Sequence, residues 1–248
     1  MPIARRNDRH EYWGPWATLG WSVLLLGIFM LVQYGVWHVF SDVMQMRDPE
    51  LASGASVFAR YAGLVLALST HATAGVCGAL LIVIIHGRRG ARPATYLAWR
   101  WAGWRTFRFW FAASLMLVGV AELANYLADR PAVPEFMRLA YETAGWLPLL
   151  ALAVVMVAPL FEEVFFRGFL YAGLAHSRIG PAGAIVVSAL IWTVIHTQYD
   201  LFDLSQVLVG GLYLGWMRAR TGSVLLPFAT HALWNAIALL ETAYFAGF

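Results

Sequence analysis

The sequence contains no lysine and only one cysteine, and charged residues of either sign make up 12% of its 248 positions. Soluble domains carry roughly 25% charged residues, so this composition excludes an ordinary soluble domain. The single Cys77 excludes an intramolecular disulfide and a cysteine-based metal cluster. All the basic residues are arginine, and a formal net charge of +3 gives no reason to predict a nucleic-acid partner.

Apolar residues make up 60% of the sequence, and the mean hydropathy is +0.65. Only helices and closed barrels can span a membrane, and the long apolar runs here differ from the alternating segments of a barrel. The sequence therefore predicts an all-α, polytopic transmembrane helical bundle of about seven spans, within a range of six to eight, forming a single integral membrane domain over residues 1–248. The predicted spans cover residues 16–40, 57–85, 107–128, 147–174, 181–200, 204–217 and 223–245.

Arginines gather at alternate ends of these spans, and positively charged loops stay in the cytoplasm. The first apolar run, residues 16–40, exceeds the roughly 7–15 residues of a signal peptide, so we expect an uncleaved helix. We predict a multi-pass protein of a bacterial inner (cell) membrane, with the N-terminus in the cytoplasm and the C-terminus outside. The arginines assigned to the cytoplasmic side are Arg5, Arg6, Arg9, Arg88, Arg89, Arg92, Arg100, Arg105, Arg108, Arg178, Arg218 and Arg220. Residues 96–108 interleave arginines with aromatics, a pattern that suits a helix lying in the headgroup layer or an aromatic anchor.

Three ionisable residues interrupt the fourth apolar run, in the stretch Glu162-Glu163-Val-Phe-Phe-Arg167. Because an ionisable residue at membrane depth is costly, such a group predicts a functional site. On a helix Glu163 and Arg167 lie four residues apart and can pair, while Glu162 points about 100° away from Glu163. A structural ion pair between helices would account for Glu163 and Arg167 but not for Glu162.

The later spans add His196, and then His231 with Asn235 one helical turn further on. Counted from the turn near residues 177–181, Glu162 and His196 lie at matched depth, about 22 Å along their helices. A Glu with a His can hold and deprotonate water, and a second His with an Asn can donate hydrogen bonds to an oxyanion. Glu162, His196 and His231 could instead ligate Zn²⁺, although the HExxH pattern is absent. No serine or cysteine nucleophile motif is present, and each histidine alone would be read as a core residue.

At these residues the chain resembles the CPBP intramembrane proteases (CAAX protease and bacteriocin-processing, or Abi, family), which include the type II CAAX prenyl endopeptidases. The family pattern is EExxxR, FxxxH and HxxxN/D on three separate membrane helices. The stretch 162–167 matches the first motif and 231–235 the third. His196 matches the second, where Trp192 replaces the usual Phe, an aromatic exchange that we do not expect to alter the chemistry. The resemblance covers about residues 147–240, the predicted catalytic core.

The resemblance implies an intramembrane endopeptidase that hydrolyses a peptide bond of a membrane-anchored protein or peptide. In the family's glutamate-dependent mechanism, Glu162 would be the general base on water and His196 would position that water. His231 and Asn235 would stabilise the oxyanion. The substrate would be a prenylated C-terminus, a bacteriocin-type leader or a membrane-anchored sorting tail, and in a bacterial chain the first is the least expected.

The resemblance also implies that Glu163 and Arg167 form a supporting pair that orients the site. Members of the family have been regarded as metalloproteases too, so zinc held by Glu162, His196 and His231 is the alternative to the preferred mechanism without a cofactor. Two other functions stay open at this stage. One is a non-enzymatic immunity or scaffold protein of the same fold, and the other is a proton-coupled transporter that uses the Glu/His set as a relay.

Overall fold

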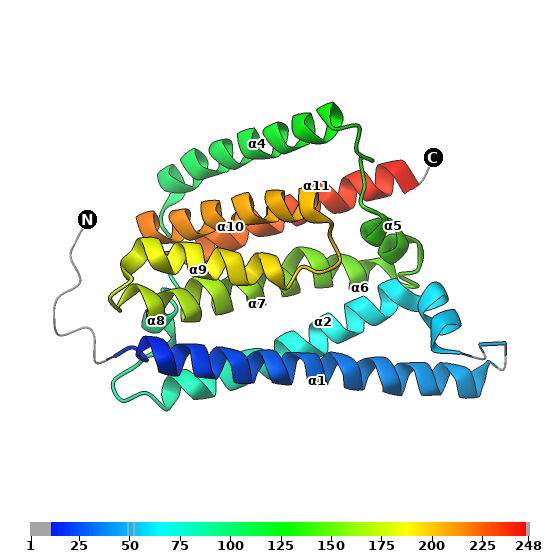
Figure 1. The fold of residues 1–248 in the computed structure, drawn as a ribbon, viewed down its shortest axis with the longest axis horizontal. Helices are drawn as coiled ribbons and strands as arrows, with labels where there is room; N and C mark the ends of the chain where they lie inside the picture. Colours follow the sequence, from blue (N-terminus) through cyan, green and yellow to red (C-terminus); the bar gives the residue numbers. More distant parts are fainter. Residues whose placement is uncertain (1–10, 49, 52, 247–248) are drawn as a thin grey trace. The chain divides into compact units, whose positions relative to one another are not determined.

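In a computed structural model, which describes residues 11–48, 50–51 and 53–246, the chain folds into helices with no strand among those residues (Figure 1). The all-α prediction is confirmed. The long helices are α1 (Pro15–Arg47), α2 (Gly54–His86), α4 (Trp104–Leu127), α9 (Gly180–Val194), α10 (Leu201–Thr221) and α11 (Leu225–Ala246). The fourth predicted span is a continuous helical run made of α6 (Leu147–Leu152), the π-helix η2 (Ala153–Val157), α7 (Ala158–Glu162), the π-helix η3 (Glu163–Leu170) and α8 (Tyr171–Ala175). Two short helices, α3 (Pro93–Tyr96) and α5 (Glu135–Glu142), lie in connections between predicted spans.

Four of the described helices are long and apolar enough to cross a membrane, by length and composition. They are Pro15–Arg47, Gly54–His86, Trp104–Leu127 and the run Leu147–Ala175. In the most apolar part of α1 only 6% of the residues are buried inside the protein, as expected for a helix that faces lipid. The chain is thus an integral membrane protein. The number of spans and the orientation of the termini stay predictions, and Arg5, Arg6 and Arg9 lie outside the described residues.

The fifth predicted span, residues 181–200, ends earlier than expected. Helix α9 stops at Val194, and residues 195–200 form the turn into α10. The reason is that Asp200 caps α10, since its Oδ1 accepts hydrogen bonds from the backbone N–H groups of Phe202 (3.0 Å) and Asp203 (3.1 Å). His196 therefore follows the end of a helix instead of lying within one.

The helix predicted for residues 96–108 is wrong over residues 97–103, which are not helical. Ala98 there has a positive φ of 52°, a conformation that interrupts a helix. The Arg100 side chain donates hydrogen bonds to the carbonyls of Thr221 and Gly222, each at 2.6 Å. These carbonyls end α10, so a cationic side chain satisfies groups that the helix itself cannot pair. The connection is held by this long-range contact, which local sequence does not encode.

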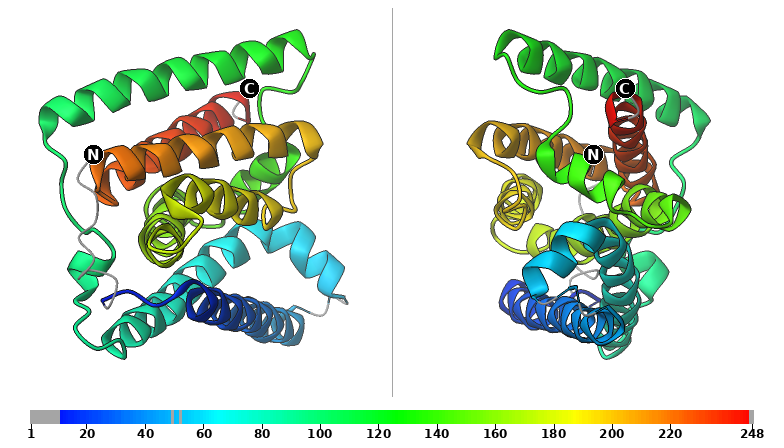
Figure 2. Two further views of the ribbon diagram at one scale, coloured as in Figure 1. Left: turned by 60° about the vertical axis from the view of Figure 1, so that its left-hand side comes forward. Right: turned by 90° about the vertical axis from the view of Figure 1, so that its right-hand side faces the viewer.

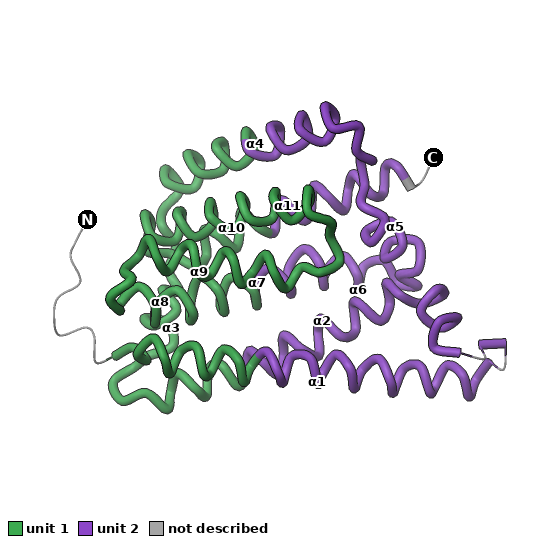
Figure 3. Tube along the Cα trace, viewed as in Figure 1, with its two compact units in different colours: residues 1–25, 79–116, 161–231 green, residues 26–78, 117–160, 232–248 purple. Residues whose placement is uncertain are grey.

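Contacts divide the chain into two compact units, shown in different colours in Figure 3. Among the described residues, unit 1 comprises 11–25, 79–116 and 161–231, and unit 2 comprises 26–78, 117–160 and 232–246. The prediction of a single domain over the whole chain stays a prediction.

In unit 1, α9 packs against α10, α8 and η3, and the ribbons of these elements lie side by side in Figures 1 and 2. Glycines allow the close approach. A Cβ added at Gly211 of α10 would lie 3.0 Å from Cε3 of Trp192 in α9. A Cβ at Gly173 of α8 would lie 1.9 Å from Oγ1 of Thr18 in α1. Small residues at such contacts are the usual way in which membrane helices pack closely.

In unit 2, α2 is kinked at Tyr61, whose φ and ψ are −134° and 16°. Because the helix is interrupted at Tyr61, backbone N–H groups in the next turn lack their helical acceptors, and Thr143 supplies acceptors for them. Its Oγ1 accepts from the N–H of Gly63 at 2.8 Å, and its carbonyl accepts from the N–H of Leu64 at 3.2 Å. The buried core around this contact is Ala67, Ala140, Ala144, Leu150 and Ala153.

Candidate active site

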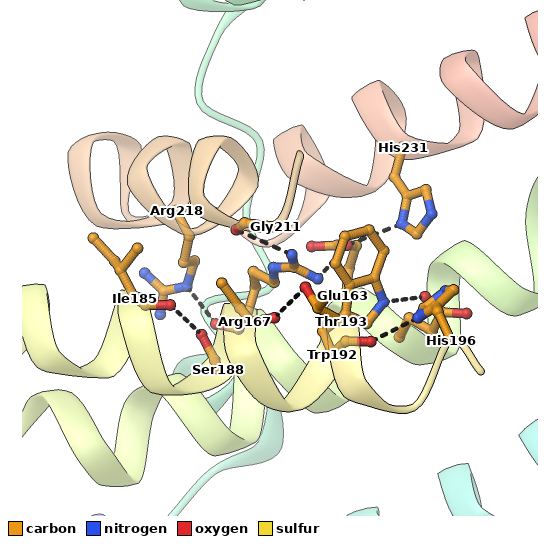
Figure 4. Close-up of polar contacts among 12 residues, drawn as sticks. Glu163, Arg167, Ile185, Ser188, Trp192, Thr193, His196, Gly211, Arg218 and His231 are labelled. Atoms are coloured by element: carbon orange, nitrogen blue, oxygen red, sulfur yellow. Dashed lines mark hydrogen bonds and ion pairs between the residues drawn. The ribbon is translucent and has the colours of Figure 1, made fainter. Parts of the chain in front are cut away.

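The first feature of the site is a buried ion pair at the start of η3. Glu163 and Arg167 are both fully buried, and Nη1 of Arg167 lies 2.9 Å from Oε1 of Glu163. The pairing expected from their spacing is therefore present. His231 of α11 brings its Nδ1 to 3.0 Å from the same carboxylate oxygen, while Nη2 of Arg167 donates to the carbonyl of Gly211 at 3.2 Å (Figure 4). The Glu163–Arg167 pair thus connects η3 to a side chain of α11 through Glu163 and to the backbone of α10 through Arg167.

The second feature is the π-helical geometry of η3, which begins at Glu163. In such a stretch hydrogen bonds run from residue i to i+5, so some carbonyls lose their α-helical donors. The carbonyl of Arg167 instead accepts a hydrogen bond from Nε of Arg218 in α10 at 2.9 Å. Short π-helical turns occur frequently at functional sites. Here the change of pitch falls between two adjacent glutamates, since α7 ends at Glu162.

Glu162 occupies a different environment from its neighbour Glu163. It is half-buried, and its Oε2 accepts a hydrogen bond of 2.5 Å from the indole Nε1 of Trp192. Within the part of the chain that the structure describes, no hydrogen bond to its Oε1 is found. Glu162 therefore keeps one carboxylate oxygen for another partner, while the Oε1 of Glu163 already has two.

His196 lies one turn after Trp192 in the chain, and the centroids of the two rings are 4.9 Å apart. Its Nδ1 is 2.6 Å from the carbonyl of Trp192. A carbonyl oxygen only accepts, so Nδ1 must carry the proton, and Nε2 of the neutral ring is left as an acceptor. The same contact to a carbonyl four residues back is made by His86 and His176, so the contact alone is ordinary helix-end geometry. What distinguishes His196 is its contact with the ring of Trp192, whose N–H donates to Glu162.

The indole of Trp192 lies at the centre of the site. Its ring meets the edges of His196 and His231 at centroid distances of 4.9 and 5.4 Å, and the guanidinium of Arg167 lies over its face at 4.6 Å. The sequence predicted that exchanging the usual Phe for Trp192 would not alter the chemistry. The structure shows one difference, since Trp192 donates its N–H to Glu162 and a Phe has no such donor, while the expectation about the chemistry stays a prediction. The sequence feature that could have indicated this contact is the indole N–H of Trp192, one turn before His196.

Asn235 belongs to unit 2, one turn after His231 in the sequence of α11. Its Nδ2 donates a hydrogen bond of 2.8 Å to the carbonyl of Val154, in the same unit. Val154 lies in η2, where π-helical geometry again leaves carbonyls available. The role in oxyanion stabilisation that the motif implies for Asn235 stays a prediction.

Comparison with known proteins bears on the segment that contains the three motifs. Residues 144–237 match the model of a family described as type II CAAX prenyl endopeptidase Rce1-like. The family resemblance is confirmed for this segment. The Rce1-like segment contains every predicted site residue, from Glu162 to Asn235.

One curated relative has no established activity of its own. It is an uncharacterized 24.3 kDa protein of Escherichia coli, 33% identical over 134 residues that cover 52% of this chain and 60% of that protein. The chain thus spans about three fifths of the length of the relative it matches. No solved structure matches the chain.

A metal centre was the predicted alternative for the Rce1-like segment, with Glu162, His196 and His231 as ligands. Among the described residues, no three His, Cys, Asp or Glu side chains are placed to hold a metal ion. Oε2 of Glu162 is engaged by an N–H group, and Nδ1 of His231 by Glu163. As arranged, the three side chains do not form a zinc site. Zinc dependence stays a prediction that chelation tests.

Proposed function

We propose that this protein is an intramembrane endopeptidase that hydrolyses a peptide bond in a membrane-anchored protein or peptide, with Glu162 as the general base. The observation that carries the proposal is that two adjacent carboxylates lie in different environments. Glu163 is fully buried and neutralised by Arg167, whereas Glu162 is half-buried and keeps one oxygen without a hydrogen-bond donor among the described residues. The match of residues 144–237 to the Rce1-like endopeptidases supports the same reaction class.

The attacking water would be held by two acceptors. Oε1 of Glu162 would accept one of its protons, and Nε2 of His196 would accept a hydrogen bond from the other, because Nδ1 of that ring is already committed to a carbonyl. Two acceptors on one water direct a lone pair of its oxygen away from both, toward the substrate carbonyl carbon. The proton on the Glu162 side is then in place for transfer to the carboxylate.

Protons and bonds balance over the reaction. Water loses one proton to Glu162 as its oxygen bonds to the carbonyl carbon, and the carbonyl oxygen becomes an oxyanion. When the tetrahedral intermediate collapses, the C–N bond breaks and Glu162 returns its proton to the leaving nitrogen. The products are a carboxylic acid, which then loses its proton to solvent or to the new amine, and that amine, and Glu162 is ionised again for the next cycle.

His231 and Asn235 are the proposed donors to the oxyanion. Nδ1 of His231 faces the Glu163 carboxylate, so Nε2 can donate only when the ring carries both protons. A donor aimed at an oxyanion in this way is worth about 10²–10³ in kcat, so Asn235→Ala is expected to slow cleavage by up to that factor.

The test is cleavage of a pooled library of membrane-tethered peptides by the purified full-length protein in liposomes, read by mass spectrometry. Glu162→Gln keeps the shape and removes the base, so we expect cleavage to fall at least about a hundredfold with helix content unchanged. The matched control is Glu142→Gln, an exposed carboxylate of α5 that pairs with Arg138 at 3.1 Å. A second matched pair is His196→Gln against His86→Gln, since both rings contact the carbonyl four residues back.

Normal cleavage by Glu162→Gln would refute the proposed base. Cleavage that survives a chelator supports the metal-free mechanism, and cleavage that is lost to the chelator and restored by Zn²⁺ would replace it with the zinc alternative. If the wild-type protein cleaves nothing and Glu162→Gln keeps full function in cells, the scaffold hypothesis takes its place.

A further inference from the structure

We propose that Trp192 is a positioning residue for the reaction: its indole N–H holds one oxygen of Glu162 so that the other faces the water. This inference rests on the proposed function. It is carried by the 2.5 Å hydrogen bond from Nε1 to Oε2 and by the burial of the indole, which is 4% exposed. A hydrogen bond to an ionised carboxylate is among the strong ones, and it fixes direction as well as energy.

The indole is itself held by two neighbours, Arg167 and Gly211. Arg167 lies over its face at 4.6 Å, and Arg167 is fixed in turn by Glu163 and by the carbonyl of Gly211. The missing Cβ of Gly211 leaves room for the six-membered ring, since a methyl group there would lie 3.0 Å from Cε3. A cation over an indole face is favourable. The N–H donor therefore belongs to a ring whose position is fixed, so the hydrogen bond forms only when the carboxylate of Glu162 is in one place.

In this arrangement the two carboxylate oxygens of Glu162 have different roles. If neither oxygen were held, the carboxyl group could rotate and present either one. With Oε2 fixed by Trp192, Oε1 is the oxygen that meets the water. Such fixing costs the base no reorganisation at the moment of reaction and so favours kcat over substrate binding.

The expected effect follows from the size of one hydrogen bond to a charged group, about ten- to a hundredfold in rate. Trp192→Phe removes the donor and keeps an aromatic ring. We expect kcat to fall by that factor and KM to stay within about twofold. Trp110→Phe is the matched control, because Trp110 is another buried indole of unit 1, packed on Tyr213 and Trp216. It should leave kcat unchanged.

A second replacement separates the N–H from the loss of ring volume. β-(3-Benzothienyl)alanine incorporated at position 192 keeps the fused ring and substitutes sulfur for N–H. It should reproduce the fall in kcat seen with Trp192→Phe. Full activity with the benzothienyl side chain would overturn the inference, since packing alone would then explain the Phe variant. A fall in thermal stability with kcat unchanged would overturn it too.

An infrared readout does not depend on turnover. The difference between spectra of the wild type and Glu162→Gln isolates the carboxylate bands of Glu162, and the same difference measured in the Trp192→Phe background should show them shifted. Unshifted bands would refute the contact. If the wild-type protein cleaves no peptide and Glu162→Gln keeps full function in cells, the proposed function fails and the positioning role fails with it, while a band shift would still establish the hydrogen bond.

Discussion

Removing the charge of Arg167 should destabilise the protein far more than removing an exposed arginine. In Arg167→Met the fully buried carboxylate of Glu163 loses its cation, and only Nδ1 of His231 remains, at 3.0 Å. Breaking a buried pair by deleting one partner costs about 3–5 kcal/mol. The pair is not fully satisfied to begin with, because Oε2 of Glu163 and Nε of Arg167 are buried with no hydrogen-bond partner in the described structure. We therefore expect about 3 kcal/mol, the lower end of this range.

The measurement is the free energy of unfolding in mixed micelles, obtained from denaturant titration followed by circular dichroism. The control is Arg138→Met in α5. Arg138 also pairs with two carboxylates, Glu135 at 2.6 Å and Glu142 at 3.1 Å, but its side chain is 48% exposed. Solvent screens such pairs, so we expect this variant to unfold like the wild type.

A double variant tests whether the cost of Arg167→Met comes from the unpaired charge of Glu163. Glu163→Gln combined with Arg167→Met leaves no charge of the pair in the interior, and the amide oxygen introduced at position 163 can still accept from His231 in place of the carboxylate. The double variant should therefore be more stable than Arg167→Met alone, which independent sites would not allow. If Arg167→Met costs no more than Arg138→Met, the pair is not buried in the working protein and the reasoning is wrong.

Two further predictions concern packing and pH. Gly173→Ala should lower the free energy of unfolding by about 1–3 kcal/mol, because its Cβ would lie 1.9 Å from Oγ1 of the buried Thr18. Gly75→Ala, with nothing within 4 Å of the added Cβ, should instead be neutral or stabilising in the same titration. Burial raises the pKa of Tyr96, in the connection before α4, to about 12. The folded protein therefore favours the neutral phenol, and this contribution to the free energy of unfolding is complete below about pH 10 and is lost as the pH rises through about 12. The wild type should thus lose about 2–3 kcal/mol of stability over this pH range, and a pH series of Tyr96→Phe should lack that loss.

The positions of the long helices could be predicted because a membrane leaves the backbone few options. An apolar run of about 20 residues has to satisfy its own N–H and C=O groups, and a helix does this locally. Each predicted span coincides with a helix over most of its length for this reason. The pair of Glu163 and Arg167 was predictable in the same way, since residues four apart on a helix meet whatever surrounds them.

Apart from the early end of the fifth span, where Asp200 caps the next helix, contacts between distant segments decide the features that the sequence did not predict. Residues 97–103 are not helical because Arg100 reaches the end of α10, more than 120 positions along the chain. The π-helical pitch of η3 goes with a donor from α10, the guanidinium of Arg218. The contact of Trp192 with Glu162 joins two helices across thirty positions. Apolar periodicity carries no information about such pairs.

Substitutions of the two adjacent glutamates should have different effects on stability and activity, because the two carboxylates differ in which oxygens remain free. Oε1 of Glu163 meets both Arg167 and His231, and its Oε2 is buried, so no substrate water can reach this carboxylate without breaking the pair. Glu162 has the opposite arrangement, with one oxygen held by Trp192 and the side chain half-exposed. Glu163→Gln would leave the charge of Arg167 buried without its counter-ion, so it must cost stability as well as activity. Glu162→Gln removes no buried counter-ion, so a loss of cleavage at unchanged stability in that variant alone would identify Glu162 as the base.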